Sequence, residues 1–174
     1  DPVAKWILEW TASDRQEVTI ADLLSHSSGL TAYLPYFRDY TGRPEFQPAI
    51  ATSPLEYPPR SKSIYSDLGF MLLGFILEDA ERKASHQWPG ATDPSCARDE
   101  QFRRIASYIT PEPLTYRPPR AWRPRTAPTE HDPWRGRTLV GEVHDENTWA
   151  LGGVAAQSGL FGTAGAVGAF ARAV

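Results

Sequence analysis

The 174-residue chain has little of what disulfide-linked, zinc-binding and membrane-spanning proteins depend on. It contains one cysteine, Cys96, which excludes an internal disulfide and a zinc site built from cysteines. No apolar run reaches the roughly 20 residues that a bilayer span needs. The formal net charge is −3, so the composition gives no general attraction to nucleic acid or to an anionic membrane. A hydrophobic content of 41% and a charged content of 22% are typical of a globular domain with a core.

Standard nucleophile and phosphate motifs are missing as well. The sequence has no G-x-S-x-G elbow, no Walker A loop, no G-x-G-x-x-G and no H-E-x-x-H. The residues taken alone therefore do not identify a reaction, and we expect no cofactor.

The two ends of the sequence indicate a fragment. It begins at Asp1 without a methionine and stops at Val174 inside a run of helix-forming residues. We expect one partial domain over residues 1–174, truncated at both ends, with a proline- and arginine-rich loop at 111–137 inside it.

The segment 57–79 is the one around which we expect the chain to be organised. Its apolar side chains follow the i, i+3, i+4, i+7, i+8 spacing of a helix and also fill other faces, which predicts a buried helix. They are Leu68, Phe70, Met71, Leu72, Leu73, Phe75, Ile76 and Leu77. Gly69 and Gly74 each cost about 1 kcal/mol of helix propensity. The close approach of another backbone would explain them.

The remaining elements follow from periodicity, caps and breakers. Thr19 and Asp22 form a capping box for a short helix, and Gly29 is its expected end. Prolines exclude a long helix from 111 to 133. Helices are expected at 1–10, 19–27, 96–109, 145–150 and 163–174, a strand at 138–143, and loops at 31–53, 84–95 and 151–162. The five aromatic residues of 31–53 either line a substrate wall or, as we favour, pack that loop onto its own domain.

Tyr65, Ser66 and Asp67 place a phenol and an acid where extended chain is expected to become helix. A tyrosine serves as a general base only where neighbouring cations lower its pKa from about 10. A helix N-terminus acts in that direction. The alternative is structural, with Tyr65 as a packing residue and Ser66 as an N-cap.

Two other clusters have both a functional and a structural interpretation. His144 and a nearby acid could ligate a metal, but no second histidine lies at helical spacing, and a cap formed by Asp145 is favoured. We expect no metal site. Six arginines with two tryptophans could bind single-stranded nucleic acid. We favour a stiff surface loop whose arginines pair with carboxylates, and we expect no nucleic-acid partner. The residues are Arg117, Arg120, Arg123, Arg125, Arg135, Arg137, Trp122 and Trp134.

Four segments, in this order, resemble the serine β-lactamase and penicillin-binding-protein-like hydrolases. VTIADLLSHSSGL at 18–30 is similar to the early helix and turn of that family, and 57–78 is similar to its Y-x-N motif, with Y-S-D here. Residues 127–153 resemble a β-lactamase-related subgroup, and SGLFGTAGAVGAF at 158–170 resembles the helix start that follows. The implied fold class is α+β, mostly α in this fragment: the helical region of the β-lactamase/transpeptidase-like fold.

The resemblance implies acyl transfer through a serine nucleophile. In the family the serine of S-x-x-K attacks an amide or ester, and the lysine and the Y-x-N tyrosine carry its proton. By motif position, Tyr65 takes the acid/base role and Asp67 takes the place of the asparagine that contacts the substrate. Gln157 and Ser158 would line the cleft. The implied partner is a small-molecule or peptide substrate, and family analogy implies a periplasmic or secreted bacterial protein.

This sequence departs from the family pattern at several points. None of its lysines (Lys5, Lys62 and Lys83) follows a serine at the S-x-x-K spacing, and neither K-T-G nor H-x-G is present. In the family these motifs would lie before Asp1 and after Val174.

Four substitutions also depart from the family. Asp67 replaces an asparagine, Arg60 stands where glycine is common, and Ala166 stands where an acid often supports the last helix. Gln157-Ser158 replaces His-Ala.

We therefore expect a fragment of a serine hydrolase that is inactive as this piece. Its parent would form an acyl-enzyme with a β-lactam, a D-Ala peptide or a small ester. The alternative is a non-catalytic relative that keeps the fold as a binding or regulatory module.

Overall fold

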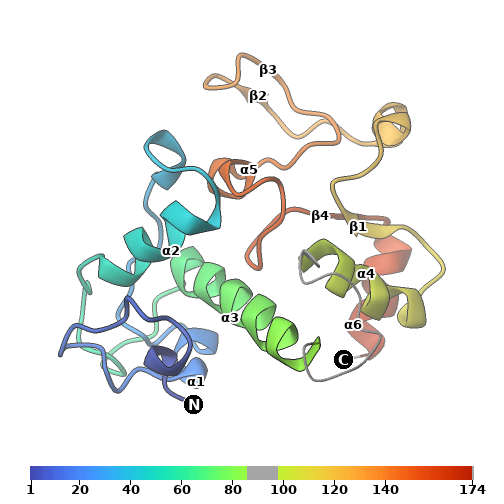
Figure 1. The fold of residues 1–174 in the computed structure, drawn as a ribbon. Helices are drawn as coiled ribbons and strands as arrows, with labels where there is room; N and C mark the ends of the chain where they lie inside the picture. Colours follow the sequence, from blue (N-terminus) through green and yellow to red (C-terminus); the bar gives the residue numbers. More distant parts are fainter. Residues whose placement is uncertain (86–97, 174) are drawn as a thin grey trace. The chain divides into compact units, whose positions relative to one another are not determined.

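The computed structural model describes residues 1–85 and 98–173 (Figure 1). The chain divides into two compact units, Asp1–Pro94 and Ser95–Val174, called here unit 1 and unit 2. About 46% of the chain is helical, and the sheets of the described part are two-stranded. This confirms the expected α+β class with a predominance of helix. The single partial domain stays a prediction.

Unit 1 is built around a long helix. Its elements are a 3-10 turn at Val3–Lys5, α1 (Ile20–Leu24), a 3-10 turn at Tyr36–Arg38, α2 (Gly42–Thr52) and α3 (Asp67–Ser85). Both α1 and α2 pack against α3 (Figure 1). Leu68, Met71 and Leu72 on α3 are fully buried, so the buried helix predicted from the apolar spacing is confirmed. The approach of Leu23 to Gly69 is ordinary van der Waals contact, at 3.7 Å from the position a Cβ would take.

The capping box of α1 is present as predicted, but the helix does not end at Gly29, as the sequence predicted. The Thr19 side chain accepts from the Asp22 N–H, and Asp22 accepts from the Thr19 N–H at 2.8 Å. The left-handed residue after the helix is His26, with φ +56°. Gly29, at φ +91°, has another role: a Cβ there would lie 2.4 Å from the Tyr57 carbonyl oxygen. Glycine at position 29 therefore lets the segment at Tyr57, which precedes α3, approach this turn.

Two other expectations for unit 1 were wrong. Residues 1–10 form only one short 3-10 turn, although Val3, Ile7 and Trp10 are buried at the predicted spacing. Residues 31–53 were expected to be a loop, yet α2 forms there with Pro48 inside it. The aromatic residues pack on one another as favoured, with Tyr36 5.9 Å from the buried Phe46. Gly42–Thr52 was missed because its prolines and aromatics obscure the helical pattern.

Unit 2 combines three helices with two small antiparallel sheets. Its elements are α4 (Arg98–Ile109), β1 (Leu114–Tyr116), a 3-10 helix at Arg120–Arg125, β2 (His131–Asp132), β3 (Arg137–Thr138), α5 (Glu146–Ala150), β4 (Leu160–Gly162) and α6 (Ala164–Ala173). Strand β1 pairs with β4, with Thr115 opposite Phe161, and β2 pairs with β3 in a hairpin. A small core of Ala106, Leu114 and Ala166 lies beside this pair.

The helices expected in unit 2 are confirmed over the described residues. Asp145 caps α5 by accepting from the Thr148 N–H at 2.6 Å, and the Thr163 hydroxyl caps α6. The strand expected at 138–143 is wrong, because only Arg137–Thr138 pairs, and residues 139–143 turn toward α5. Cys96 and most of the loop expected at 84–95 lie outside the described residues. Within residues 1–85 and 98–173 no helix is long and apolar enough to cross a bilayer.

Candidate functional site

The triplet Tyr65-Ser66-Asp67 lies at the N-terminus of α3. The Ser66 hydroxyl accepts from the Gly69 N–H at 3.2 Å and donates to the Thr31 carbonyl at 2.8 Å. Ser66 is therefore the N-cap of α3 and is itself 2% exposed. The Asp67 N–H donates to the Ala32 carbonyl at 3.0 Å. The triplet is thus anchored to the segment after α1 on both sides of the cap.

Tyr65 is 61% exposed, so its ring is not a core residue. Its hydroxyl donates to Asp67 Oδ1 at 2.9 Å. His26 lies under the tyrosine, with ring centroids 4.8 Å apart, and stacks on Phe70 at 4.9 Å. Because His26 Nδ1 accepts from the Ser66 N–H at 3.1 Å, the ring is held against the start of α3. Sequence reasoning missed His26, which carried no motif signal.

The turn that leads to Tyr65 is held by Arg60. This residue has φ +66°, the left-handed region that favours glycine, which explains why glycine suits this position. Its guanidinium donates to both carboxylate oxygens of Asp22 at 3.0 Å. The Arg60 side chain, with further hydrogen bonds from Thr19, lowers the pKa of Asp22 to about 2 although burial opposes this. A side-chain pair therefore ties α1 to the chain entering α3.

Gln157 and Ser158, predicted to line a cleft, lie in unit 2 beside helix α5. Gln157 Nε2 donates to Thr148 Oγ1 at 2.9 Å, and Thr148 Oγ1 lies 2.6 Å from Ser158 Oγ. Thr148 is fully buried. The close approach requires Gly159, at φ +106°, because a Cβ there would lie 3.2 Å from Thr148 Cγ2 and 2.9 Å from the Gly153 carbonyl oxygen.

Ser158 faces a cleft of about 830 Å³ in unit 2, a volume within the range of small-molecule sites. We call it the unit 2 cleft. The proline- and arginine-rich loop forms one wall, and the segments around α5 and β4 form the other. Its lining includes Pro118, Trp122, Arg125, Thr126, Thr129, Glu142, Val143, His144, Asp145, Glu146, Ser158, Leu160 and Phe161. Gln157 is not among the residues that line this cleft, and the substrate-binding roles of Gln157 and Ser158 stay predictions.

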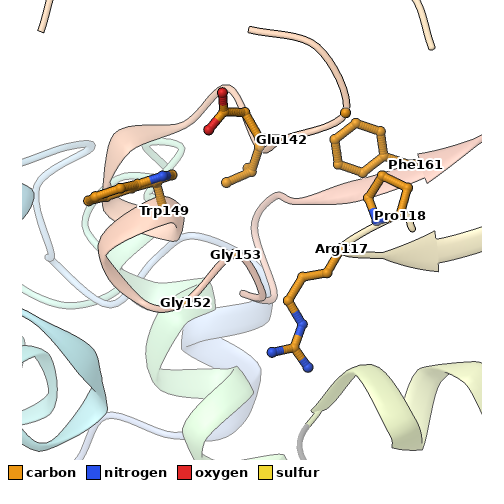
Figure 2. A pocket seen from close by; sticks show the side chains of 9 residues that line it. Arg117, Pro118, Glu142, Trp149, Gly152, Gly153 and Phe161 are labelled. Carbon is orange, nitrogen blue, oxygen red and sulfur yellow. The ribbon is translucent and has the colours of Figure 1, made fainter. Parts of the chain in front are cut away.

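A smaller cavity of about 340 Å³ lies next to the cleft and shares Glu142 and Phe161 with it. Figure 2 shows its side chains, with Trp149 from α5 on one side and Phe161 from β4 on the other. Arg117 on its wall pairs with Asp99 at the start of α4.

The arginines of the loop pair with carboxylates, as favoured from the sequence, at three positions. Besides Arg117, Arg137 binds both oxygens of Glu142, at 2.8 and 3.0 Å, and lowers the pKa of that carboxyl. Arg135 pairs with Asp132 inside the hairpin, where both side chains are at most 3% exposed. Arg135 also donates to the Val143 and His144 carbonyls.

His144, considered as a metal ligand, instead lies 2.9 Å from Glu130 through Nε2. In the part of the chain that the structure describes, no three His, Cys, Asp or Glu residues are grouped so that they could hold a metal ion. Ala166 is fully buried in the small core and contributes no charge.

The structure therefore brings the predicted residues together in two pairs. Tyr65 and Asp67 are joined by a hydrogen bond within unit 1. Gln157 and Ser158 are joined through Thr148 within unit 2, a partner that sequence reasoning missed because ten residues separate it from Ser158.

Comparison with known proteins gives one family. The Beta-lactamase family model matches residues 1–174. A "Putative D-alanyl-D-alanine carboxypeptidase" of Salmonella gallinarum is 32% identical over 168 residues, which cover 84% of this chain and 36% of the relative. Proteins with the same name from Salmonella newport and Salmonella enteritidis are 31% identical over the same shares. The chain thus spans little more than a third of the length of these curated relatives.

Proposed function

Because this chain belongs to the beta-lactamase family, we propose that it carries part of the site of a serine hydrolase that works through an acyl-enzyme. The substrate class is an amide or ester: a β-lactam, a peptide ending in D-alanine or a small ester. Residues 1–174 contain no S-x-x-K motif, so we expect the 174-residue chain alone to be inactive in acyl transfer. The names of the relatives support a peptide substrate.

The arrangement of Tyr65 is the observation that carries this proposal. An exposed phenol is fixed at the start of a buried helix, and its hydroxyl hydrogen bond to Asp67 orients it. Ser66 caps the helix, as the structural alternative expected, but Tyr65 is 61% exposed and so is not the buried packing residue that this alternative requires. A positioned phenol at a helix N-terminus suits proton transfer to and from a serine where a cation, such as the lysine of an S-x-x-K motif, lies beside it and offsets the Asp67 carboxylate.

Asp67 gives the proposed site a different polarity from its relatives that have asparagine. An ionised carboxylate only accepts hydrogen bonds, whereas an amide also donates. We propose that Asp67 orients Tyr65 and accepts from a substrate N–H. Substrates that rely on a donor at this position, as penicillin-type amides do in the family, would then bind less well than peptides or esters.

The competing function is a binding or regulatory module without catalysis. The presence of Asp67 in place of asparagine is the feature that favours it. The full-length gene product separates the two proposals, because an upstream S-x-x-K serine is required for acyl transfer.

The test measures acylation of the full-length protein by a fluorescent penicillin, and turnover of a nitrophenyl ester and of an N-acetylated peptide ending in D-alanyl-D-alanine. Tyr65→Phe should reduce acylation by about 10²–10⁴-fold, the contribution of a positioned acid/base. Tyr108→Phe is the matched control, because Tyr108 is 91% exposed on α4. Equal rates for the wild type and Tyr65→Phe would make Tyr65 structural. Labelling of the isolated chain would contradict its proposed inactivity.

A further inference from the structure

The three side chains Gln157, Thr148 and Ser158 form a hydrogen-bonded row that ends in the unit 2 cleft. Gln157 and Thr148 lie behind the wall, and Ser158 is on it. Thr148 is fixed twice, by burial and by its backbone N–H, which donates to Asp145. Because the middle residue of the row is held in place, the orientation of the Gln157 amide can determine the orientation of the Ser158 hydroxyl.

The direction of the row follows from the amide. Gln157 Nε2 donates to Thr148 Oγ1, and in the 2.6 Å contact between Thr148 Oγ1 and Ser158 Oγ either hydroxyl could be the donor. Thr148 is the better donor, because its hydroxyl is buried and its proton has no other acceptor among the described residues. Ser158 then accepts from Thr148, and its own proton is directed into the cleft. Within residues 1–85 and 98–173 Ser158 makes no second side-chain hydrogen bond.

The opposite orientation of the amide is less favourable. Gln157 Oε1 is buried without a hydrogen-bond partner in the described part of the chain. If the amide were flipped, its NH₂ group, with two N–H donors, would occupy the buried position that Oε1 occupies now. Buried unpaired donors are rarer than under-satisfied carbonyl oxygens.

We propose that the unit 2 cleft binds a peptide or amide ligand and that Ser158 donates a hydrogen bond to a carbonyl oxygen of this ligand. Gln157 and Thr148 set the direction in which the Ser158 hydroxyl donates. The inference rests on the proposed function for the class of ligand. Ser158 is the specificity-determining residue, and Gln157 is a positioning residue that acts through it.

The lining of the cleft fits such a ligand. Trp122, Leu160 and Phe161 provide apolar surface, as sites for peptide segments do. Glu142 is occupied by Arg137, and Asp145 by the Thr148 N–H, so neither carboxylate excludes a carbonyl group from the site.

The substitutions at Gln157 and Ser158 test the direction of the row. Gln157→Glu nearly preserves shape, but an ionised carboxylate accepts from Thr148, Thr148 accepts from Ser158, and the cleft loses its donor. Ser158→Ala removes the donor itself. Ser158→Thr keeps a hydroxyl and serves as the conservative rescue. Ser107→Ala, on the exposed face of α4, is the matched control outside the cleft.

The measurement is calorimetric binding of the N-acetylated D-alanyl-D-alanine peptide to the full-length protein carrying Tyr65→Phe, in which turnover is slowed. Ser158→Ala and Gln157→Glu should each weaken binding by about three- to tenfold at pH 7, the contribution of one neutral hydrogen bond. The double variant should equal Ser158→Ala, because both remove the same bond. Ser158→Thr should bind within about twofold of the parent.

The pH dependence of the Gln157→Glu variant separates direction from packing. Once protonated, the introduced carboxyl group donates to Thr148 again, so binding should recover as pH falls below about 4, the ordinary range of a glutamic acid. The other charged groups of the cleft, namely Arg125, Glu142, His144, Asp145 and Glu146, are the same in the parent, so the ratio of the two pH profiles removes their contribution. A purely structural role of Gln157 predicts no recovery.

Failure of this inference can be distinguished from failure of the proposed function. A full-length protein that binds the peptide but does not hydrolyse it overturns the proposed function and leaves this inference standing. Unchanged binding in Ser158→Ala, additive losses in the double variant, or no binding of the peptide to the parent overturns the inference whatever the activity.

Discussion

Residues 1–85 bury sixteen apolar side chains, whereas residues 98–173 bury seven, four of which are alanines. In unit 1 the large buried side chains, such as Trp10, Phe46 and Phe75, surround one long helix. In unit 2 the small apolar core is accompanied by a buried ion pair, Arg135 with Asp132, in the β2–β3 hairpin. Unit 1 is thus stabilised mainly by apolar burial, which is non-directional, and unit 2 to a larger extent by directional polar contacts.

This difference matters for the candidate residues. Tyr65 immediately precedes the N-cap of α3, a helix whose position is set by packing, so its surroundings tolerate exposure of the ring. Ser158 lies on a turn whose position is set by hydrogen bonds and by the close approach of Gly159 to Gly153. Small polar substitutions should therefore alter the unit 2 cleft more than the start of α3.

The largest effect on stability should come from the core of unit 1. Leu72→Ala removes a fully buried side chain from α3 and should lower the free energy of unfolding by about 2–5 kcal/mol. Leu77→Ala, on the same helix and 55% exposed, should change it by less than about 0.5 kcal/mol. Urea unfolding measures both. Similar losses would mean that burial on α3 does not determine the stability of unit 1.

A smaller effect should come from the polar hairpin of unit 2. Arg135→Met leaves the Val143 and His144 carbonyls without their donor and Asp132 without its cation. The two lost carbonyl bonds alone should destabilise unit 2 by about 1–3 kcal/mol. Hydrogen exchange of amides in 131–148 localises the loss. Arg137→Met, which breaks a pair whose arginine is half exposed, is the control and should change little.

Position 60 separates backbone strain from ion pairing. Arg60→Ala and Arg60→Gly both lose the pair with Asp22, but only alanine must hold φ +66°. The glycine variant should therefore be more stable than the alanine variant by about 1 kcal/mol in urea unfolding. Equal stabilities would mean that the turn adjusts its backbone when the pair is lost.

The smallest effect should be the acid dependence of the Asp22–Arg60 pair, because Arg60 is half exposed and the pair is screened by solvent. The pKa of Asp22 is lowered from 3.8 to about 2, so the folded state binds this proton less readily than the unfolded state. The stabilisation is complete above about pH 4 and is lost as pH falls toward 2. The stability difference between the wild type and Arg60→Met should shrink over this range. A constant difference would exclude the pair as its source.

Sequence reasoning succeeded where one local rule determined the structure. The apolar spacing of Leu68 to Ile76 predicted α3, and the Thr19–Asp22 capping box predicted the start of α1. It failed where the decisive contact was not local. Helix α2 forms although Pro48 lies inside it, and its Phe46 packs against Tyr36 in the preceding turn.

The same distinction between local and non-local contacts applies to the candidate residues. The sequence predicted that Tyr65 and Asp67 lie at a helix start, because both are in one motif. It contained no sign of His26 beneath Tyr65 or of Thr148 behind Ser158, because both contacts require the chain to turn back on itself. The chemical roles of Tyr65, Asp67, Gln157 and Ser158 remain predictions until the full-length protein is assayed.

The β1–β4 pair has a consequence for how the unit 2 cleft could change through insertion and deletion. Most residues that line the cleft lie in the loop 117–159, which is closed by the pairing of Leu114–Tyr116 with Leu160–Gly162. The entropy of closing a loop rises only slowly, by about 0.6 kcal/mol for each doubling of its length. Extra residues within the segments of this loop that line the cleft should therefore reshape it at little cost in loop-closure entropy, provided that the short pair of strands stays closed.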